Sequence, residues 1–417
     1  MRRFHVLLLI IIAGLLGYWV GVNKITYDWK NFHPHLTVVN KEPPPSESTV
    51  DFSLFWTVLD KIQTMYYDKT VIDPQKLLNG AITGMVGSLG DPYTVYLPPV
   101  QNTGFKQSLA GQFFGIGAEL GMRDKQIVVI SPLDGMPAQK AGLKAGDAIV
   151  KVDGASTDGW TLQQAVDKIR GPKGTTVTLT VQRKDESSTK NVVITRDTIT
   201  VKSVAGWVKK VKDIDGIKQD TFKGIQDESV AYIRLSQFGD NSNQEWLALV
   251  NSLYPQIKSM NAKGVILDLR NNPGGYLTDA TFIASEFLDS GTVVIEDKGD
   301  GNQTPFPTVR KGLLTNTKVV VLINKGSASA SEIVSGALRD HQRATLVGET
   351  SFGKGTIQEA DDLGNGAGIH ITIAKWLTPN GTWVHGKGLT PDVAVSLDPK
   401  DQSHDTQLEK AVEELVR

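Results

Sequence analysis

Short apolar runs alternate with amphipathic stretches through the second half of this 417-residue chain. The runs have the length of buried strands, and the stretches between them show the helical spacing of apolar residues. The expected strands are 230–235, 264–269, 319–323 and 344–347, and the expected helices are 243–260, 277–289 and 330–340. Strands that alternate with helices in this way predict an α/β domain with a largely parallel sheet.

The pattern changes between residues 108 and 185, where β-like runs are separated by glycine turns. The runs lie at 126–130, 148–152 and 177–182, with one helical stretch at 162–169. This order predicts a compact α+β module of about 80 residues.

Residues 51–97 look helical. Phe52, Trp56 and Leu59 recur at helical spacing, and a second helix starts at Pro74 and stops near Gly90. Proline is well tolerated in the first turn of a helix, which supports this start. We expect the aromatic residues to pack within a small helical unit.

The amino terminus is the most apolar part of the chain. Residues 6–22 carry no charge and follow Arg2 and Arg3. As a helix, this run reaches roughly 26 Å, at the short end for crossing a hydrocarbon core. The two arginines favour a cytoplasmic amino terminus with the rest of the chain outside. We therefore expect an uncleaved single-pass anchor in the cell membrane, with a cleaved signal peptide and a secreted or periplasmic protein as the main alternative. A buried soluble helix is a third alternative.

Three consecutive prolines, Pro43 to Pro45, make residues 24–50 a stiff and extended linker. The expected organisation is therefore an anchor at 1–23, a linker at 24–50, a helical region at 51–105, the small module at 106–190 and the α/β domain at 191–417.

Composition excludes several classes of function. Lys and Arg number 44 and Asp and Glu 45, so the formal net charge is −1 and a nucleic-acid binder is disfavoured. The absence of cysteine excludes disulfides, thiolate chemistry and cysteine-containing zinc sites. No His-Glu-x-x-His motif or carboxylate–histidine cluster is present, so we expect neither a metal nor another cofactor.

A serine-rich segment offers a candidate nucleophile. Residues 324–332, Asn-Lys-Gly-Ser-Ala-Ser-Ala-Ser-Glu, follow an apolar run and lead into a helix. A hydroxyl at such a turn lies near helix N–H groups that can stabilise an oxyanion. The alternative is helix capping, because serine followed by glutamate is good N-cap chemistry.

A lysine between glycines offers a candidate base. Lys354 lies between Gly353 and Gly355, and the surrounding residues nearly match a phosphate-binding loop. Gly355 stands where that loop needs a hydroxyl for magnesium, so an NTPase is disfavoured. A lysine in a dry cavity loses its charge readily and can then take a proton from a serine. Gln358 is placed to hold the amine by a hydrogen bond without adding charge.

A third element is Leu269-Arg-Asn-Asn-Pro-Gly-Gly-Tyr-Leu277, whose paired glycines can direct a backbone N–H at an oxyanion. The alternative is a tight turn that needs glycine for a positive φ. No histidine-based triad is evident; His341, His370 and His385 remain as alternative bases or as structural residues.

The small module contains a glycine-flanked stretch that leads into a strand. Phe114, Gly115, Ile116, Gly117 and Ala118 present backbone N–H groups that can cradle a terminal carboxylate. A peptide bound there can extend the edge of the sheet. The alternative is a purely structural turn.

Together these segments resemble a carboxyl-terminal processing protease, the tail-specific type of peptidase family S41, and the small module closely resembles a PDZ domain. The resemblance covers residues 51–397. The marks of the PDZ domain are the segments 131–138 and 141–149. The marks of the protease are Leu-Gly-Asp-Pro-Tyr-Thr at 89–94, Asp-Leu-Arg-Asn-Asn-Pro-Gly-Gly at 268–275, the serines at 327–332, Phe-Gly-Lys-Gly at 352–355 with Gln358, and the segment 378–392.

The resemblance implies that a helical segment and a PDZ domain precede an α/β serine protease core of the ClpP/crotonase-like type. With the membrane anchor expected from residues 1–23, the predicted fold class is an α+β multidomain chain. By position, Ser329 matches the family nucleophile, Lys354 the general base and Gln358 its orienting partner. The oxyanion donors correspond to the N–H groups of Ala330 and Gly275, with Gly274 left open as an alternative to Gly275.

The implied function is a serine endopeptidase that cleaves exported proteins near their carboxyl termini. The PDZ domain is expected to recognise the carboxyl terminus of a substrate or adaptor and to gate the site. The expected partners are proteins or peptides with free apolar carboxyl termini, an adaptor or activating protein, the membrane, and further copies of the chain in a homodimer or higher oligomer. Two rival functions are a non-catalytic PDZ scaffold at the membrane and a trypsin-like protease with a PDZ appendage, whose Gly-x-Ser-Gly motif is missing.

Overall fold

The computed structural model describes residues 25–30, 33–38 and 51–417, apart from short gaps at 124, 134, 184–185, 187, 399–400 and 402. The expected anchor at 6–22 and the three prolines at 43–45 lie outside the described residues. Of the helices that are described, none has both the length and the apolar character needed to cross a membrane. The chain divides near residue 76 into two compact units.

The first unit contains an antiparallel pair of strands, β1 (Ile25–Lys30) and β2 (His33–Val38). The sequence does not predict this pair, because Pro34 and the nearby prolines indicate an extended linker. The alternating aromatic and β-branched residues of β1 favour a strand. Helix α2 (Ser53–Met65) and the short 3₁₀ helix η1 (Lys69–Val71) follow. Contrary to the expectation of aromatic packing, α2 buries none of its residues, and Trp56 is 53% exposed.

Helix α3 (Pro74–Gly87) contains the boundary between the units, and its start at Pro74 confirms the sequence prediction. Strand β3 (Val95–Leu97) and helix α4 (Pro99–Leu109) follow, so the expected helical region is interrupted by one short strand.

Residues 112–200 form the small module. The elements are β4 (Gln112–Gly115), β5 (Ala118–Arg123), β6 (Gln126–Pro132), α5 (Pro137–Lys140), β7 (Ala148–Val152), β8 (Ala155–Ser156), α6 (Leu162–Ile169), β9 (Thr176–Gln182), β10 (Thr189–Thr195) and β11 (Asp197–Thr200). The main sheet has the order β10-β9-β7-β6-β5, with β8 beside β7, and β11 pairs separately with β4. The strands and helix expected from the sequence are confirmed here.

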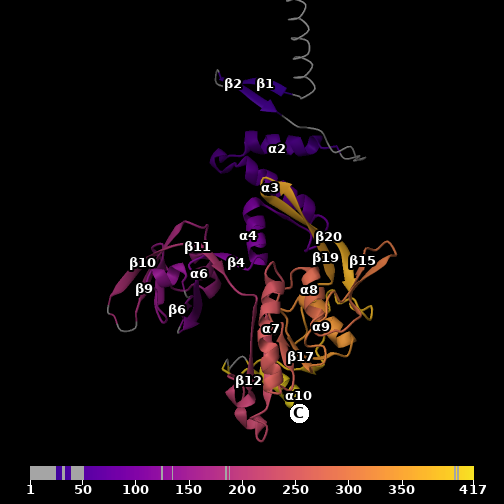
Figure 1. The fold of residues 1–417 in the computed structure, drawn as a ribbon. Helices are drawn as coiled ribbons and strands as arrows, with labels where there is room; N and C mark the ends of the chain where they lie inside the picture. Colours follow the sequence, from indigo (N-terminus) through magenta and orange to yellow (C-terminus); the bar gives the residue numbers. More distant parts are fainter. Residues whose placement is uncertain are drawn as a thin grey trace, which may run out of the picture. The chain divides into compact units, whose positions relative to one another are not determined.

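A six-stranded sheet is the centre of the remaining domain (Figure 1). Its order is β12 (Val204–Lys210), β13 (Ser229–Leu235), β14 (Val265–Asp268), β17 (Val319–Ile323), β18 (Ala344–Gly348) and β21 (Val393–Ala394). Only β12 runs antiparallel to its neighbour. The largely parallel sheet expected from the sequence is thus confirmed.

Helices cover both faces of this sheet. One face carries α7 (Ser242–Ser259), α8 (Leu277–Ala284) and α9 (Ala330–Asp340). The other face carries α10 (Thr406–Val416), together with the 3₁₀ turns η2 (Val211–Asp213) and η3 (Gln219–Phe222). Helix α8 ends five residues earlier than the sequence pattern predicts, at Ala284 rather than near 289.

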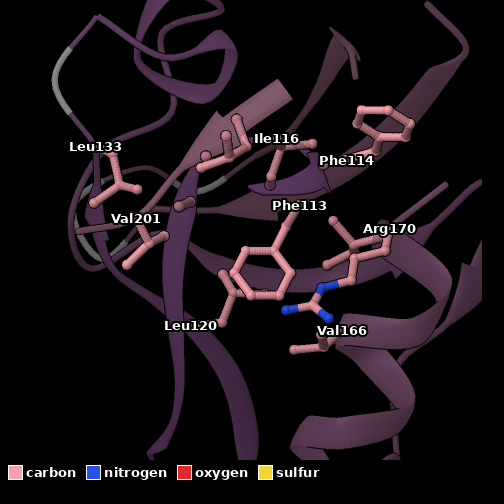
Figure 2. Close-up of a pocket in the computed structure, with 13 residues that line it drawn as sticks. Phe113, Phe114, Ile116, Leu120, Leu133, Val166, Arg170 and Val201 are labelled. Carbon is pink, nitrogen blue, oxygen red and sulfur yellow. The ribbon is translucent and has the colours of Figure 1, made fainter. Parts of the chain in front are cut away.

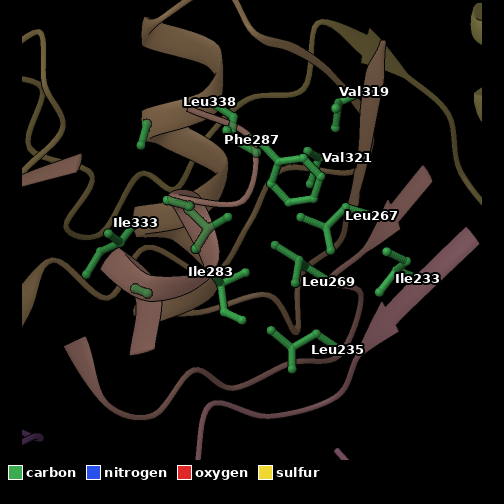
Figure 3. Packing of buried hydrophobic residues seen from close by; sticks show 14 of the residues in the cluster. Ile233, Leu235, Leu267, Leu269, Ile283, Phe287, Val319, Val321, Ile333 and Leu338 are labelled. Atoms are coloured by element: carbon green, nitrogen blue, oxygen red, sulfur yellow. The ribbon is translucent and has the colours of Figure 1, made fainter. Parts of the chain in front are cut away.

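The period of two along each strand decides which face a residue joins. Val319 and Val321 pack with the α7–α9 side, whereas Val320 packs with α10. Figure 3 shows the first of these cores, with Phe287 close to Leu267 and Val321. Because both faces are buried, the strands read as continuous apolar runs in the sequence.

A second, antiparallel sheet was not predicted. It has the order β16 (Gln303–Pro307), β15 (Thr292–Asp297), β20 (Ala367–Leu377) and β19 (Thr356–Gly364), and β3 pairs with β20. The long β19–β20 hairpin carries polar residues on much of its length, which hides the strand signal in the sequence. This sheet supplies one wall of the site described next.

Candidate active site

A cavity of about 470 Å³ lies in the second unit, beside the amino-terminal end of α9. Its walls come from α4, the loop 273–277, the first turns of α9 and strands β19 and β20. It is lined by several residues that the sequence singled out, namely Ser329, Lys354, Gln358, Gly274, Gly275 and His370. These residues lie up to 96 positions apart in the sequence, from Gly274 to His370, and meet at one site.

Ser329 is the residue from which α9 begins, and it follows the buried strand β17. Its φ of 55° is uncommon for a residue with a side chain and marks local strain. The neighbouring serines have structural contacts: the Ser327 hydroxyl donates to the carbonyl of Leu269 at 2.8 Å, and that of Ser331 to the carbonyl of Asn272 at 2.9 Å. Ser329 is the serine of this segment that lines the cavity.

Lys354 lies in the loop between β18 and β19 and is partly buried. Burial lowers the pKa of Lys354 below its ordinary value, while the negative charges of Asp91 and Glu332 oppose that shift. The Lys354 Nζ lies 5.3 Å from the centre of the Tyr93 ring. The indole of Trp376 donates to the backbone carbonyl of Lys354 at 2.9 Å and so fixes the loop.

Gln358 lies on β19 and lines the same cavity. Its side-chain nitrogen donates to the hydroxyls of Thr356 and Thr372, both at 2.9 Å. These two described residues, Gln358 and Lys354, make no direct hydrogen bond with one another. With its nitrogen occupied, the amide oxygen of Gln358 is the atom left to face an amine.

The glycine loop after β14 contacts the nucleophile segment directly. A Cβ on Gly274 would lie 2.8 Å from the Cβ of Ser329, and one on Gly275 would lie 1.6 Å from the carbonyl oxygen of Phe238. Both positions also have positive φ, 96° and 141°. Glycine is therefore required at both, as the tight-turn alternative also predicts.

The two glycines differ in what their N–H groups do. The N–H of Gly274 donates to the side-chain oxygen of the buried Asn272 at 2.9 Å. Within the part of the chain that the structure describes, no acceptor takes the N–H of Gly275 or of Ala330, the first residue of α9. Those two N–H groups are free to donate to a bound oxygen.

The histidines occupy three different settings. His341 follows the end of α9 and its ring nitrogen contacts the carbonyl of Thr292. His370 lines the cavity next to Phe105, and burial lowers the pKa of His370. His385 stacks on Trp383 with ring centres 5.1 Å apart. Among the described residues no cluster of three His, Asp or Glu side chains is placed to hold a metal ion.

A second cavity, of about 220 Å³, lies in the small module. Figure 2 shows it with the apolar side chains of Ile116, Leu120 and Val166 around it and the Arg170 guanidinium beside the Phe113 ring. The five residues Phe114 to Ala118 expected to bind a tail all line this cavity. Gly117 has a φ of 71°, and a Cβ there would lie 2.4 Å from Met136.

The edge beside this cavity is open. Strand β5 is the last strand of its sheet and pairs only with β6 in the described part of the module. Helix α6 supplies Val166 and Ile169 across from β5, so the cavity lies between a strand edge and a helix. Arg170, the residue after α6, is the only charged residue among the described ones that line it, and its guanidinium is 4.8 Å from the Phe113 ring centre.

Three segments of the chain match models of known protein families. Residues 229–395 match the model of peptidase family S41, residues 105–182 that of the PDZ domain, and residues 11–99 that of the N-terminal domain of the activating protease CtpB. The carboxy-terminal-processing protease of Bartonella bacilliformis is 39% identical over 357 residues, which cover 85% of this chain and 77% of that protein. The chain belongs to peptidase family S41.

Two further comparisons agree. Carboxy-terminal processing protease CtpB of Bacillus subtilis is 39% identical over 391 residues, covering 92% of this chain and 75% of that protein. The crystal structure of a putative S41 protease from Bacteroides fragilis shares the fold, with a TM-score of 0.54 at 15% identity over 88% of this chain and 98% of that one. The chain is thus a serine peptidase with a PDZ domain before its S41 core.

Sequence reasoning missed three residues of this candidate site. Asn272 holds the N–H of Gly274, Tyr93 covers the Lys354 amine, and the Glu332 carboxylate accepts from the N–H of Ser329 at 2.9 Å. Glu332 is the third residue of α9, as the helix-capping alternative predicts, so that alternative also describes part of this geometry. The sequence signal is a glutamate three residues after a serine at the start of a helix. The burial of Glu332 and its bonds to residues 351–354 are not visible in the sequence.

Proposed function

We propose that the chain is a serine endopeptidase that cleaves exported proteins near their carboxyl termini, with Ser329 as nucleophile and Lys354 as general base. The observation that carries this proposal is the shared cavity, in which a partly buried lysine with a lowered pKa lines the same walls as the serine at the start of α9. A neutral amine is the form of lysine that accepts a proton.

The proposed reaction is acyl transfer. Lys354 takes the hydroxyl proton of Ser329 while the serine oxygen bonds to the scissile carbonyl carbon. The carbon–nitrogen bond then breaks, and the Lys354 ammonium returns the proton to the leaving amine. Lys354 then takes a proton from water as the water oxygen bonds to the ester carbon. The bond from that carbon to the Ser329 oxygen breaks, and the Lys354 ammonium returns the proton to the serine.

The oxyanion of this reaction is proposed to accept from the N–H groups of Ala330 and Gly275. Neither N–H has an acceptor among the described residues, which supports that choice, and the hydrogen bond from the Gly274 N–H to Asn272 argues against Gly274. Donors held in advance at a site of developing charge are a large source of rate enhancement. Gln358 is proposed to orient the Lys354 amine through its amide oxygen.

The PDZ domain is proposed to bind the free, apolar carboxyl terminus of a substrate or an adaptor protein. The open edge of β5 offers main-chain pairing, and the apolar lining favours an apolar last residue. The residues Gly115 to Ala118 and Arg170 are the proposed partners of the tail carboxylate.

Gating of the cavity by the PDZ domain is part of the proposal. Helix α4 lines the active-site cavity through Phe105, Ser108 and Leu109. Strand β4, which starts at Gln112, lines the PDZ cavity through Phe113. Only two residues separate the helix from the strand, and we propose that movement of one wall reaches the other through this short connection.

Residues 6–22 are proposed to anchor the protein in the cell membrane with the protease outside the cytoplasm, and cleavage of this segment to a secreted or periplasmic form is the alternative. An activating protein and self-association in a homodimer or higher oligomer are further proposed partners. Digestion of intact cells with an added protease tests the first statement, because only a core that faces outward is then accessible.

The central test uses the full-length protein and a flexible protein substrate with an apolar free carboxyl terminus. Ser329→Ala and Lys354→Ala are expected to abolish cleavage, measured by mass spectrometry of the fragments, with unchanged circular dichroism. Lys325→Ala is the matched control, because Lys325 is an exposed lysine of the same segment and should keep full activity. Full activity of either active-site variant contradicts the serine–lysine assignment.

A further inference from the structure

Glu332 is a carboxylate with no exposed surface, one turn into α9. It accepts four hydrogen bonds from groups on two separate segments. The donors are the N–H of Ser329 at 2.9 Å, the N–H of Gly353 at 2.7 Å, the N–H of Lys354 at 2.9 Å and the hydroxyl of Ser351 at 2.6 Å. One side chain therefore joins the backbone of the proposed nucleophile to that of the proposed base.

The direction of these bonds indicates the charge state of the side chain. Three partners are backbone N–H groups, which only donate. The fourth, the Ser351 hydroxyl, itself accepts from the N–H of Leu389 at 2.6 Å, so its proton points to Glu332. A group surrounded by donors alone binds best as an ionised carboxylate, and four charge-assisted bonds offset much of the cost of burying it.

The network extends beyond the two segments. Ser351 also donates its own N–H to the carbonyl of Leu389 at 3.1 Å, which ties the lysine loop to the segment 384–389. A Cβ on Gly353 would lie 2.8 Å from the N–H nitrogen of Gly388, so these backbones are in close contact. The backbone position of Lys354 is thus set by contacts of its loop with the segment 384–389 and by the hydrogen bonds to Glu332.

We propose that Glu332, supported by Ser351, is the positioning residue that holds Ser329 in its strained conformation and keeps the Lys354 backbone in register with it. The proposal rests on the proposed function, because it assigns these contacts to the same serine–lysine reaction. Glu332 does not line the cavity, so it acts through the residues it holds.

Glu332 has a second effect, through its charge. The groups that act on the Lys354 amine are Asp91 and Glu332, whose negative charges favour its protonated form, with His370 and the Tyr93 ring close by. Removal of the Glu332 charge therefore lowers the pKa of Lys354. A residue with a purely structural role elsewhere in the core would leave that pKa unchanged.

The test compares two variants at Glu332 and one at Ser351 with two buried controls. Glu332→Gln directs an amide N–H at groups that are themselves donors. Glu332→Asp keeps the negative charge, but its side chain is one methylene shorter, so the carboxylate lies farther from its donors. Glu286→Gln is the control for loss of a buried carboxylate, since Glu286 bonds to Trp246, Arg310 and Leu313 away from the cavity. Ser335→Ala is the control for Ser351→Ala, since the Ser335 hydroxyl bonds within α9 alone.

For Glu332→Gln we expect kcat to fall about 100-fold with KM little changed, the size of effect that a misplaced reacting group produces. The acid limb of its kcat/KM profile should also move to lower pH. Glu332→Asp should lower kcat without shifting the acid limb of the kcat/KM profile. Ser351→Ala should lose about tenfold in kcat, as expected for one charge-assisted bond. Both controls should keep wild-type kcat, even where their melting temperatures fall.

Wild-type kcat in Glu332→Gln, or an equal loss in Glu286→Gln, overturns the positioning role. If Glu332→Gln does not fold, Ser351→Ala decides: a kcat equal to that of Ser335→Ala overturns the proposal. Ser329→Ala is measured alongside. An active Ser329→Ala variant means that the proposed function has failed, whereas an inactive one together with a fully active Glu332→Gln means that only the positioning role has failed.

Discussion

Arg270 and Asp405 form a two-point ion pair, with nitrogen–oxygen distances of 2.8 and 2.9 Å. Asp405 is also the N-cap residue of α10, where it accepts from the N–H of Leu408. The same guanidinium bonds to Asp268, which ends β14 and has no exposed surface. Arg270 therefore links the start of the glycine loop, residues 269–277, to the start of α10.

Asp405→Ala should destabilise the protein by about 2–3 kcal/mol, because it removes both a helix cap and one partner of a largely buried ion pair. Urea denaturation measures this change. Glu414→Ala on the same helix is the control: its ion pair with Lys410 is partly exposed, so a change below about 1 kcal/mol is expected. Equal effects of the two substitutions would show that the Arg270–Asp405 pair adds no stability.

The pH dependence of cleavage should follow the charge of Lys354. Burial lowers the pKa of this amine, and the reaction needs its neutral form. Activity is therefore expected to rise with pH through a midpoint below the ordinary lysine value of about 10.4. A kcat/KM profile in buffers of constant ionic strength measures it, and activity that falls over this range contradicts a lysine base.

Asp91→Asn should move that midpoint to lower pH. The negative charge of Asp91 stabilises the protonated lysine, so its removal favours the neutral form and lowers the pKa of Lys354. Asp361→Asn provides the matched control, because Asp361 is an exposed carboxylate farther along β19 and should leave the midpoint in place. A midpoint that moves to higher pH in Asp91→Asn is the contradicting result.

Much of the core could be predicted from the sequence because its strands are buried on both faces. The apolar run at 319–323 and the helical pattern at 330–340 coincide with β17 and α9 as observed. Because the strand and the helix could both be predicted, the turn that contains Ser329 could be placed between them. Local pattern was sufficient wherever an element makes most of its contacts with the interior.

The pattern was insufficient where contacts between distant segments decide the structure. The β19–β20 hairpin is polar over much of its length, and it is held by pairing with β15 and β3 rather than by apolar periodicity. Likewise, the hydrogen bond from the Gly274 N–H to Asn272 distinguishes two glycines that the sequence leaves equivalent. Such bonds depend on three-dimensional positions that no spacing rule supplies.

Arg170→Ala should weaken binding of a free carboxyl-terminal peptide to the PDZ domain by about tenfold or more, the usual effect of losing a charge-assisted hydrogen bond. Fluorescence anisotropy with the full-length Ser329→Ala protein measures binding without cleavage. Arg123→Ala, at the far end of β5, is the control and should bind as before. An amidated peptide that binds as tightly as the free acid would argue against carboxylate recognition.

Gly117→Ala should also abolish tail binding. A side chain there meets Met136 at 2.4 Å and must adopt a φ of 71°, so the loop cannot keep its N–H groups in place. Gly135 has a similar φ of 73° but open space around it, so Gly135→Ala introduces comparable backbone strain without the clash. Retained binding in Gly117→Ala, or an equal loss in Gly135→Ala, contradicts a specific role for the Gly115–Gly117 loop.

Occupancy of the PDZ cavity should change the rate at which the protease cleaves a separate reporter substrate. Helix α4 carries Leu109, whose carbonyl accepts from the N–H of Asp240, and Gly111 with a φ of 63° turns the chain from the helix into β4. A non-cleavable tail peptide added in trans should alter kcat or KM of the wild type. The response should disappear with Arg170→Ala or with the amidated peptide, while cleavage without peptide stays unchanged. Equal turnover with and without the free-tail peptide, at concentrations that saturate the PDZ domain by anisotropy, would show that the two cavities work independently.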